Sequence, residues 1–379
     1  MTQNLKLKKM RKLILFLFLS CSFTLISQTN NAYEKVDAKI AQHSSSFDEN
    51  AIAELVEFIN SNFSNETDKL RAVFTWITGN FDYDVENMFT IRFFSDPQEI
   101  IDEMLKERKG VCMHFAYLFD EIANKLGIKT YVITGYTKRN DFSHAWNASF
   151  INSVWYLTDA TWGAGFVRRQ RFVRRQNNDY FKVIPTDFIR SHKPFDPLWQ
   201  FLNFPISAQE FSVGRAEMNR GKPFFNFADT LEVHKNLPRM EQLTSTNRRI
   251  KQNGIVNVLI FDYLRENMRK IERQRRNQIA VDSFNSALYL YNDGVQRLND
   301  FILYRKRQFT PQKTEAEIRE MVKSAERSLI NSRNELRKIL TTDTNLRNSI
   351  RQLKTSIDDE IREINRQNEF IDKYFREFY

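Results

Sequence analysis

The chain has 379 residues, of which 41% are hydrophobic and 27% are charged, which is enough for a core in each of two or three domains. Its formal net charge is +10, but residues 1–27 contain five basic and no acidic residues, and the remainder carries only +5. A charge this small on so long a chain gives no reason to expect a nucleic-acid-binding protein.

The first residues have the order of an export signal. Five lysines and arginines between Lys6 and Lys12 precede an apolar run, Leu13–Ile26, which ends at the small residue Ser27. This order is typical of a secretory signal peptide, and the run is short for a membrane span. We therefore expect residues 1–27 to be removed, and the mature chain to be periplasmic or secreted with no stable membrane span.

Cys21 and Cys112 are the two cysteines of the chain. Cys21 offers an alternative for the N-terminus, a lipoprotein acylated at this residue, although Phe18 replaces the leucine that usually stands three residues earlier. Once Cys21 is removed, Cys112 has no partner for an internal disulfide, so the fold must rely on core packing. A lone cysteine is most often a buried small hydrophobe. The residues around Cys112 favour a role in catalysis instead.

Residues from about 30 to 165 predict a compact α+β unit. Apolar residues at helical spacing predict amphipathic helices. These helices cover residues 50–63, 70–79 and 113–126. The apolar period then changes from that of a helix to that of a strand. The predicted strands are 129–136, 144–150 and 154–159. Helices followed by antiparallel strands are typical of the α+β class.

The C-terminal part is predicted to be helical from about residue 245. Apolar stripes recur at steps of three and four, and Thr314-x-x-Glu317 forms a capping box after Pro311. Breaks at Pro311 and at Thr341–Thr344 favour antiparallel packing as a three-helix bundle or a coiled-coil-like arm.

Cys112 lies where a nucleophilic thiol is expected. It starts a predicted helix, where the helix dipole and free backbone N–H groups favour the thiolate. Gly110 would let the backbone approach a substrate, and the amide of Cys112 would contribute to an oxyanion hole. His144 begins one predicted strand and Asp159 ends the next, so the carboxylate is expected to orient the imidazole toward sulfur.

Three sequence blocks with these residues resemble the transglutaminase-like superfamily. They are Gly110-Val111-Cys112, His144-Ala145-Trp146-Asn147 and Trp155-Tyr156-x-x-Asp159-x-Thr161-Trp162-Gly163. Upstream, Trp76-Ile77-x-x-Asn80-Phe81-x-Tyr83-Asp84 also fits the pattern. Segments between Tyr180 and Gln200 resemble the extension of the kyphoscoliosis-peptidase-like branch.

The resemblance implies a papain-like core in which Cys112, His144 and Asp159 attack an amide, form a thioester and pass the acyl group to water or an amine. It also implies a domain division: signal peptide 1–27, catalytic domain with family extension 28–207, linker 208–244 and helical domain 245–379. Tyr83 and Trp162 are the expected oxyanion or substrate-positioning residues. No cofactor is expected, since the chain has no acidic calcium loop and no Cys/His cluster for a metal.

Other polar residues have structural interpretations. His114 follows the nucleophile on the same helix and is expected to point away from the sulfur, and His192 is expected to be a structural hydrogen-bonding histidine. Five arginines between Arg168 and Arg175 predict a solvated hairpin, or alternatively an electropositive lip that favours acidic peptides or surface glycans.

Two functions remain open. The first is an exported cysteine enzyme, a peptidase or acyltransferase, whose partner is a protein or peptide substrate. The second is a weakly catalytic or non-catalytic binding protein at the cell surface, with a protein partner docked on the C-terminal helices 245–379. The intact Cys112, His144 and Asp159 favour the enzyme, because a pure scaffold needs none of them.

Overall fold

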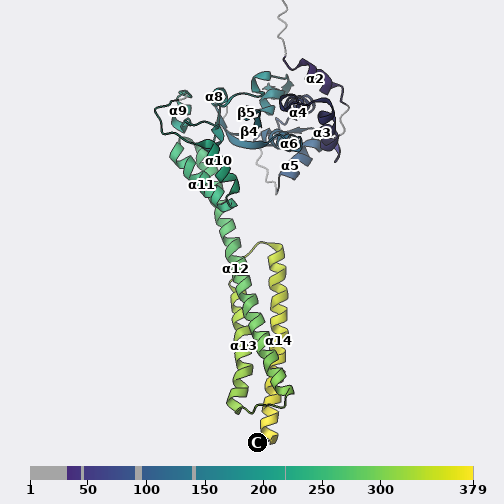
Figure 1. The fold of residues 1–379 in the computed structure, drawn as a ribbon, viewed down its shortest axis with the longest axis vertical. Helices are drawn as coiled ribbons and strands as arrows, with labels where there is room; N and C mark the ends of the chain where they lie inside the picture. Colours follow the sequence, from purple (N-terminus) through teal and green to yellow (C-terminus); the bar gives the residue numbers. More distant parts are fainter. Residues whose placement is uncertain (1–31, 44–46, 90–95, 139–141, 218, 379) are drawn as a thin grey trace, which may run out of the picture. The chain divides into compact units, whose positions relative to one another are not determined.

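The computed structural model describes residues 32–43, 47–89, 96–138, 142–217 and 219–378 (Figure 1). The predicted signal peptide, residues 1–27 with Cys21, lies outside these ranges. Of the helices in the described ranges, none combines the length and apolar character that a membrane crossing requires. Contacts divide the chain into two compact units. The first runs to Lys235 and includes Arg248–Phe261, and the second contains Asn236–Asn247 and Asp262–Tyr379.

The first unit begins with helices that build most of its apolar core. They are α2 (Glu34–Ala41), α3 (Ala51–Asn62), α4 (Glu66–Asn80), α5 (Pro97–Glu107) and α6 (Cys112–Lys125). Asn65 caps α4 by accepting from the amide of Asp68, and Asp96 caps α5 by accepting from the amide of Glu99. The apolar faces of α3, α4 and α6 are fully buried in one cluster, so burial of these faces stabilises the layer that carries Cys112.

An antiparallel four-stranded sheet forms the second layer. Its strands are β3 (Thr130–Thr137), β4 (Ser143–Ile151), β5 (Val154–Thr158) and β8 (His192–Pro194), in the order β5-β4-β3-β8. Helix α6 packs against β3 and β4 (Figure 1). The edge strand β8 was not predicted from the sequence. It is only three residues long and contains Pro194, which an edge position tolerates.

Short elements follow the sheet in the first unit. They are α7 (Ala160–Ala164), the hairpin β6 (Gly165–Arg168) and β7 (Arg171–Arg174), η1 (Asn178–Tyr180), α8 (Pro185–Phe188), η2 (Pro197–Gln200), α9 (Ala208–Ser212) and α10 (Phe227–Asn236). Two-residue strands β1 (Asp82–Tyr83) and β2 (Lys109–Gly110) pair in parallel earlier in the chain.

The C-terminal end of α11 (Arg239–Asn253) is bonded into the first unit. Arg249 makes a two-bonded ion pair with Asp196, at 2.8 and 2.6 Å, and both side chains are buried. Asn253 accepts a hydrogen bond of 2.8 Å from the buried Lys193. Residues 248–253 therefore contribute side chains to the first unit. The domain boundaries expected at residues 207 and 245 stay predictions.

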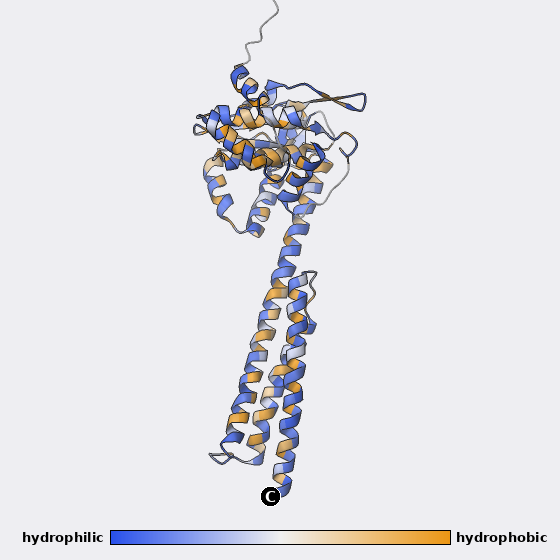
Figure 2. Ribbon diagram, turned by 90° about the vertical axis from the view of Figure 1, so that its right-hand side faces the viewer, coloured by the Kyte–Doolittle hydropathy of each residue, from blue (hydrophilic) through white to orange (hydrophobic). Residues whose placement is uncertain are grey.

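The second unit is built from long helices. They are α12 (Val258–Lys306), of which Asp262 onward belongs to this unit, α13 (Glu315–Arg337) and α14 (Thr344–Phe378). Apolar and polar residues alternate along each of them (Figure 2), and one apolar cluster joins α12, α13 and α14. The capping box is present, with Thr314 and Glu317 bonded to each other's backbone amides. The predicted α+β class with an all-helical C-terminal region is confirmed.

Candidate active site

Cys112 is the first residue of α6 and is partly exposed. Because the helix begins here, the amide N–H of Cys112 has no acceptor within the helix. The amide of Val111 donates to Nδ1 of His114 at 3.2 Å, and His114 is buried. His114 is therefore a structural residue of the first turn, as its position on the helix predicted.

Gly110 has a different role from the predicted one. A Cβ at this position would lie 2.5 Å from Cβ of His114 and 2.7 Å from Sδ of Met104. The missing side chain thus makes room for the first turn of α6 and for α5, and the close approach of a substrate to this backbone stays a prediction.

Tyr83 reaches Cys112 through the short parallel pair β1–β2. Tyr83 lies opposite Gly110, and the amide of Asp84 donates to the carbonyl of Gly110 at 2.9 Å. Burial raises the pKa of Tyr83, and the negative charges of Cys112 and Asp159 raise it further. A tyrosine 29 residues before the cysteine in sequence therefore stays a neutral hydroxyl close to the sulfur.

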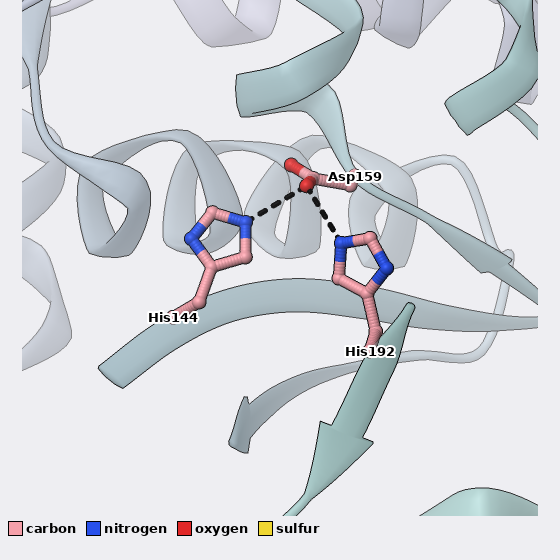
Figure 3. A group of neighbouring side chains, drawn as sticks. All are labelled: His144, Asp159 and His192. Carbon is pink, nitrogen blue, oxygen red and sulfur yellow. Dashed lines mark hydrogen bonds and ion pairs between the residues drawn. The ribbon is translucent and has the colours of Figure 1, made fainter. Parts of the chain in front are cut away.

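His144 and Asp159 meet as the adjacent strands predicted. Nε2 of His144 lies 2.8 Å from Oδ2 of Asp159, and both side chains are buried (Figure 3). Burial alone would lower the pKa of His144, but the charge of Asp159 and hydrogen bonds to Asp159 and Cys112 raise it. Since Nε2 faces the carboxylate, Nδ1 is the nitrogen left for the sulfur. The three predicted residues are thus brought together.

Asp159 is fixed on all sides. Its Oδ1 accepts the backbone amides of Thr161 at 2.9 Å and Trp162 at 3.0 Å, which begin α7. Burial would raise the pKa of Asp159, but His144 and His192 lower it overall. The carboxylate therefore stays ionised and can only accept hydrogen bonds.

The second histidine on Asp159 was not predicted to be there. Nε2 of His192 lies 3.2 Å from Oδ2 of Asp159, the same oxygen that His144 contacts (Figure 3). The expectation that His192 is a hydrogen-bonding histidine is confirmed, but its partner could not be found from sequence. His192 is on the edge strand β8, and no spacing rule connects it to Asp159.

These three side chains are also close enough to share a metal ion. Both Nε2 atoms, however, lie at hydrogen-bond distance from one carboxylate oxygen. A metal ion held at about 2.0–2.2 Å from each ligand would need its ligand atoms to converge on a common empty point. The observed distances are those of two N–H groups donating to one ionised oxygen.

A cavity of about 880 Å³ opens beside His144. Tyr83 and Trp162, the two expected positioning residues, both line it. The Trp162 ring lies 5.3 Å from the His144 ring and 4.6 Å from the His192 ring, centre to centre. Residues of the β6–β7 hairpin and of η1 also line the cavity, including Phe166, Phe172 and Tyr180. A substrate in this cavity would contact aromatic side chains next to the imidazole.

The arginine-rich segment forms that hairpin. Arg169 and Gln170 make its turn with positive φ values of 50° and 61°. Arg174 is bonded to the carbonyl of Thr78 and to Asp82, and Arg175 lines the cavity. Arg168, Arg169 and Arg171 are exposed and form no ion pair with another described residue. The solvated hairpin is confirmed, and of its arginines Arg175 lines the cavity.

Comparison with known proteins identifies the domain. Residues 53–160 match the family model of the transglutaminase-like superfamily, a segment that contains Cys112, His144 and Asp159 and ends before His192. The chain thus contains a transglutaminase-like domain.

Curated relatives share the predicted branch. The kyphoscoliosis peptidase of Mus musculus is 30% identical over 192 residues, which are 47% of this chain and 28% of that protein. A LIM and transglutaminase domain protein of Caenorhabditis elegans is 24% identical over 51% of this chain and 29% of its own length. The chain spans less than a third of these curated relatives. A crystal structure of a TGase aligns at 19% identity over 44% of this chain and 42% of that chain, with a TM-score of 0.26.

Proposed function

We propose that this protein is a cysteine enzyme that attacks peptide or protein amides through a thioester on Cys112. The observation that carries the proposal is the buried pair of His144 and Asp159 at 2.8 Å, bonded in turn to a partly exposed thiol at the start of α6. An ionised carboxylate that holds an imidazole against a thiol is the arrangement that nucleophilic catalysis by cysteine requires.

The first step transfers the acyl group to sulfur. The Cys112 thiolate forms a bond to the amide carbonyl carbon, the C–N bond breaks, and the amine leaves with a proton from Nδ1 of His144. Asp159 stabilises the imidazolium through Nε2 and keeps the ring in the orientation that directs Nδ1 at sulfur.

The second step regenerates the enzyme. Water or a primary amine gives a proton to Nδ1 of His144 and attacks the thioester, which releases the acyl product and the thiolate. We propose the amide of Cys112, at the start of α6, and the neutral hydroxyl of Tyr83 as the donors to the oxyanion in both steps. Trp162 covers His144 on the cavity side.

Hydrolysis is the proposed main outcome. Water reaches a cavity of this size freely, and two of the curated relatives that the chain resembles bear the name peptidase. A screen of peptides with and without a biotinylated primary amine distinguishes the two outcomes, since transamidation incorporates biotin and hydrolysis does not. Cys112→Ala should abolish either product. Turnover by Cys112→Ala equal to wild type would exclude the thioester route.

Asp159→Asn tests whether Asp159 orients the imidazole of His144. The amide keeps the size of the carboxylate but removes its charge, so we expect turnover to fall by about 10²–10⁴-fold while the fold persists. The side chain of Asn147 is no substitute, because it donates to the carbonyl of Ala116 on α6 at 2.9 Å. Full activity of Asp159→Asn would remove the orienting role.

We also propose that the protein acts outside the cytoplasm and that the helices of the second unit hold a protein partner. The N-terminal charge and apolar run support export. Cell fractionation with an antibody against the chain tests export. Deletion of α13 and α14 tests for the partner. Loss of the protein's localisation, or of a protein that co-purifies with it, would support the partner. If Cys112→Ala still fulfils the protein's role in the same cell, the binding function is favoured instead.

A further inference from the structure

His192 is held as tightly as the predicted catalytic residues. It is fully buried, and its ring stacks on Phe188 with centres 4.1 Å apart. The Trp162 ring lies 4.6 Å away on another side. A side chain confined in this way keeps its Nε2 at one place relative to Asp159.

The proton positions follow from the neighbours. Asp159 is ionised, so Nε2 of His192 must carry the hydrogen in the 3.2 Å contact with Oδ2. At the other nitrogen, Nδ1 lies 2.7 Å from Oγ of Ser191. In a neutral ring this hydroxyl donates to Nδ1 and selects the tautomer with hydrogen on Nε2.

The contact completes the restraint of Asp159. Two backbone amides fix Oδ1, and without His192 the other oxygen would be fixed only by His144 itself. A carboxylate held by three donors independent of His144 presents its remaining lone pair to that imidazole before any substrate binds.

We propose that His192 is a positioning residue, which holds Asp159 for its pairing with His144 and so helps to keep Cys112 as a thiolate. The inference rests on the proposed function. It also lies outside what the family match covers, because that match ends at residue 160. The titratable groups that face this cluster are Tyr83 from β1, Cys112 from α6, His144 from β4 and Tyr180 beside His192.

The experiment measures the alkylation rate of Cys112 in the full chain by iodoacetamide between pH 4 and pH 10. Peptide mass mapping separates Cys112 from Cys21. Three variants form a matched set. In His192→Gln an N–H lies the same number of bonds from Cβ as Nε2, in His192→Asn it lies one bond closer, and His192→Phe keeps the stacking without a donor. Thermal unfolding followed by tryptophan fluorescence checks the fold of each.

We expect Cys112 of wild type to react faster with iodoacetamide at pH 6 than a free thiol does, because His144 is hydrogen-bonded to it. In His192→Asn and His192→Phe, Asp159 is held less firmly for its bond to the His144 imidazolium, so the midpoint of the alkylation rate against pH should rise by about one pH unit. Below that midpoint these variants should react roughly tenfold more slowly than wild type. His192→Gln should recover most of this shift. Equal midpoints in wild type and all three folded variants, or equal impairment of the Gln and Asn variants, would overturn the positioning role.

Two further outcomes are informative. If the His192 variants do not fold, Ser191→Ala tests the same chain of hydrogen bonds from outside the core, and a midpoint unchanged from wild type would overturn the proposal. If wild type itself labels as an ordinary thiol, the proposed function fails at Cys112, whatever the variants do.

Discussion

The ion pair between Arg249 and Asp196 should contribute strongly to the stability of the first unit. The two side chains lie 53 residues apart and are 9% and 2% exposed, with two hydrogen bonds of 2.8 and 2.6 Å. Asp196 also accepts the amide of Leu198 at 3.0 Å. Removal of one partner leaves a buried charge unpaired, which typically costs about 3–5 kcal/mol. We therefore expect Arg249→Leu to lower the free energy of unfolding by about this amount.

Urea unfolding followed by tryptophan fluorescence measures the free energy of unfolding of the first unit. All five tryptophans, at positions 76, 146, 155, 162 and 199, belong to the first unit. Arg190→Leu is the matched control, because its partner Asp187 is 3.9 Å away and both side chains are exposed, so the cost should be at most about 1 kcal/mol. A loss below 1 kcal/mol in Arg249→Leu would refute the argument that α11 completes this unit.

Three further predictions follow from the same contacts. A chain truncated after residue 240 loses Arg249 and Asn253, so it should aggregate or show altered alkylation of Cys112. A chain truncated after residue 261 keeps both residues and should do neither. Equal behaviour of the two chains would contradict the placement of α11. Replacement of the exposed hairpin arginines 168, 169 and 171 by glutamine should weaken turnover of acidic peptides several-fold and leave turnover of neutral peptides unaffected. Parallel assays on the two peptide sets would show this, and an equal effect on both sets would count against the electropositive lip. Burial lowers the pKa of Lys193 to about 7 from 10.5, so between these values the unfolded chain binds a proton that the folded chain does not, and stability should rise from about pH 7 to pH 9.5. Lys193→Met should flatten that rise in urea titrations, and an unchanged slope would mean that the lysine is charged in the folded state.

Elements with a long regular period could be predicted from the sequence. The helices over 50–63 and 113–126 and the three strands are observed within one or two residues, because each buries one continuous face. Helix α5 was missed although Asp96 and Pro97 form a recognisable start, so that signal was available.

Part of the site could be predicted from the sequence, for a physical reason. Adjacent antiparallel strands bring His144 and Asp159 together, and local order along the chain predicts such neighbours. His192 on the short strand β8, and Arg249 on α11, meet their partners only through the tertiary fold. Neither a spacing nor a period connects residues 33 or 53 positions apart, so no local pattern could reveal these pairs.

If His144 keeps Cys112 as a reactive thiolate, the rate of Cys112 alkylation at pH 6 should differ between wild type and His144→Ala. A thiol with the ordinary pKa of about 8.5 is almost fully protonated at this pH. Wild type should therefore react at least about tenfold faster than His144→Ala. Equal rates in the two proteins, both rising only toward pH 8.5, would contradict it.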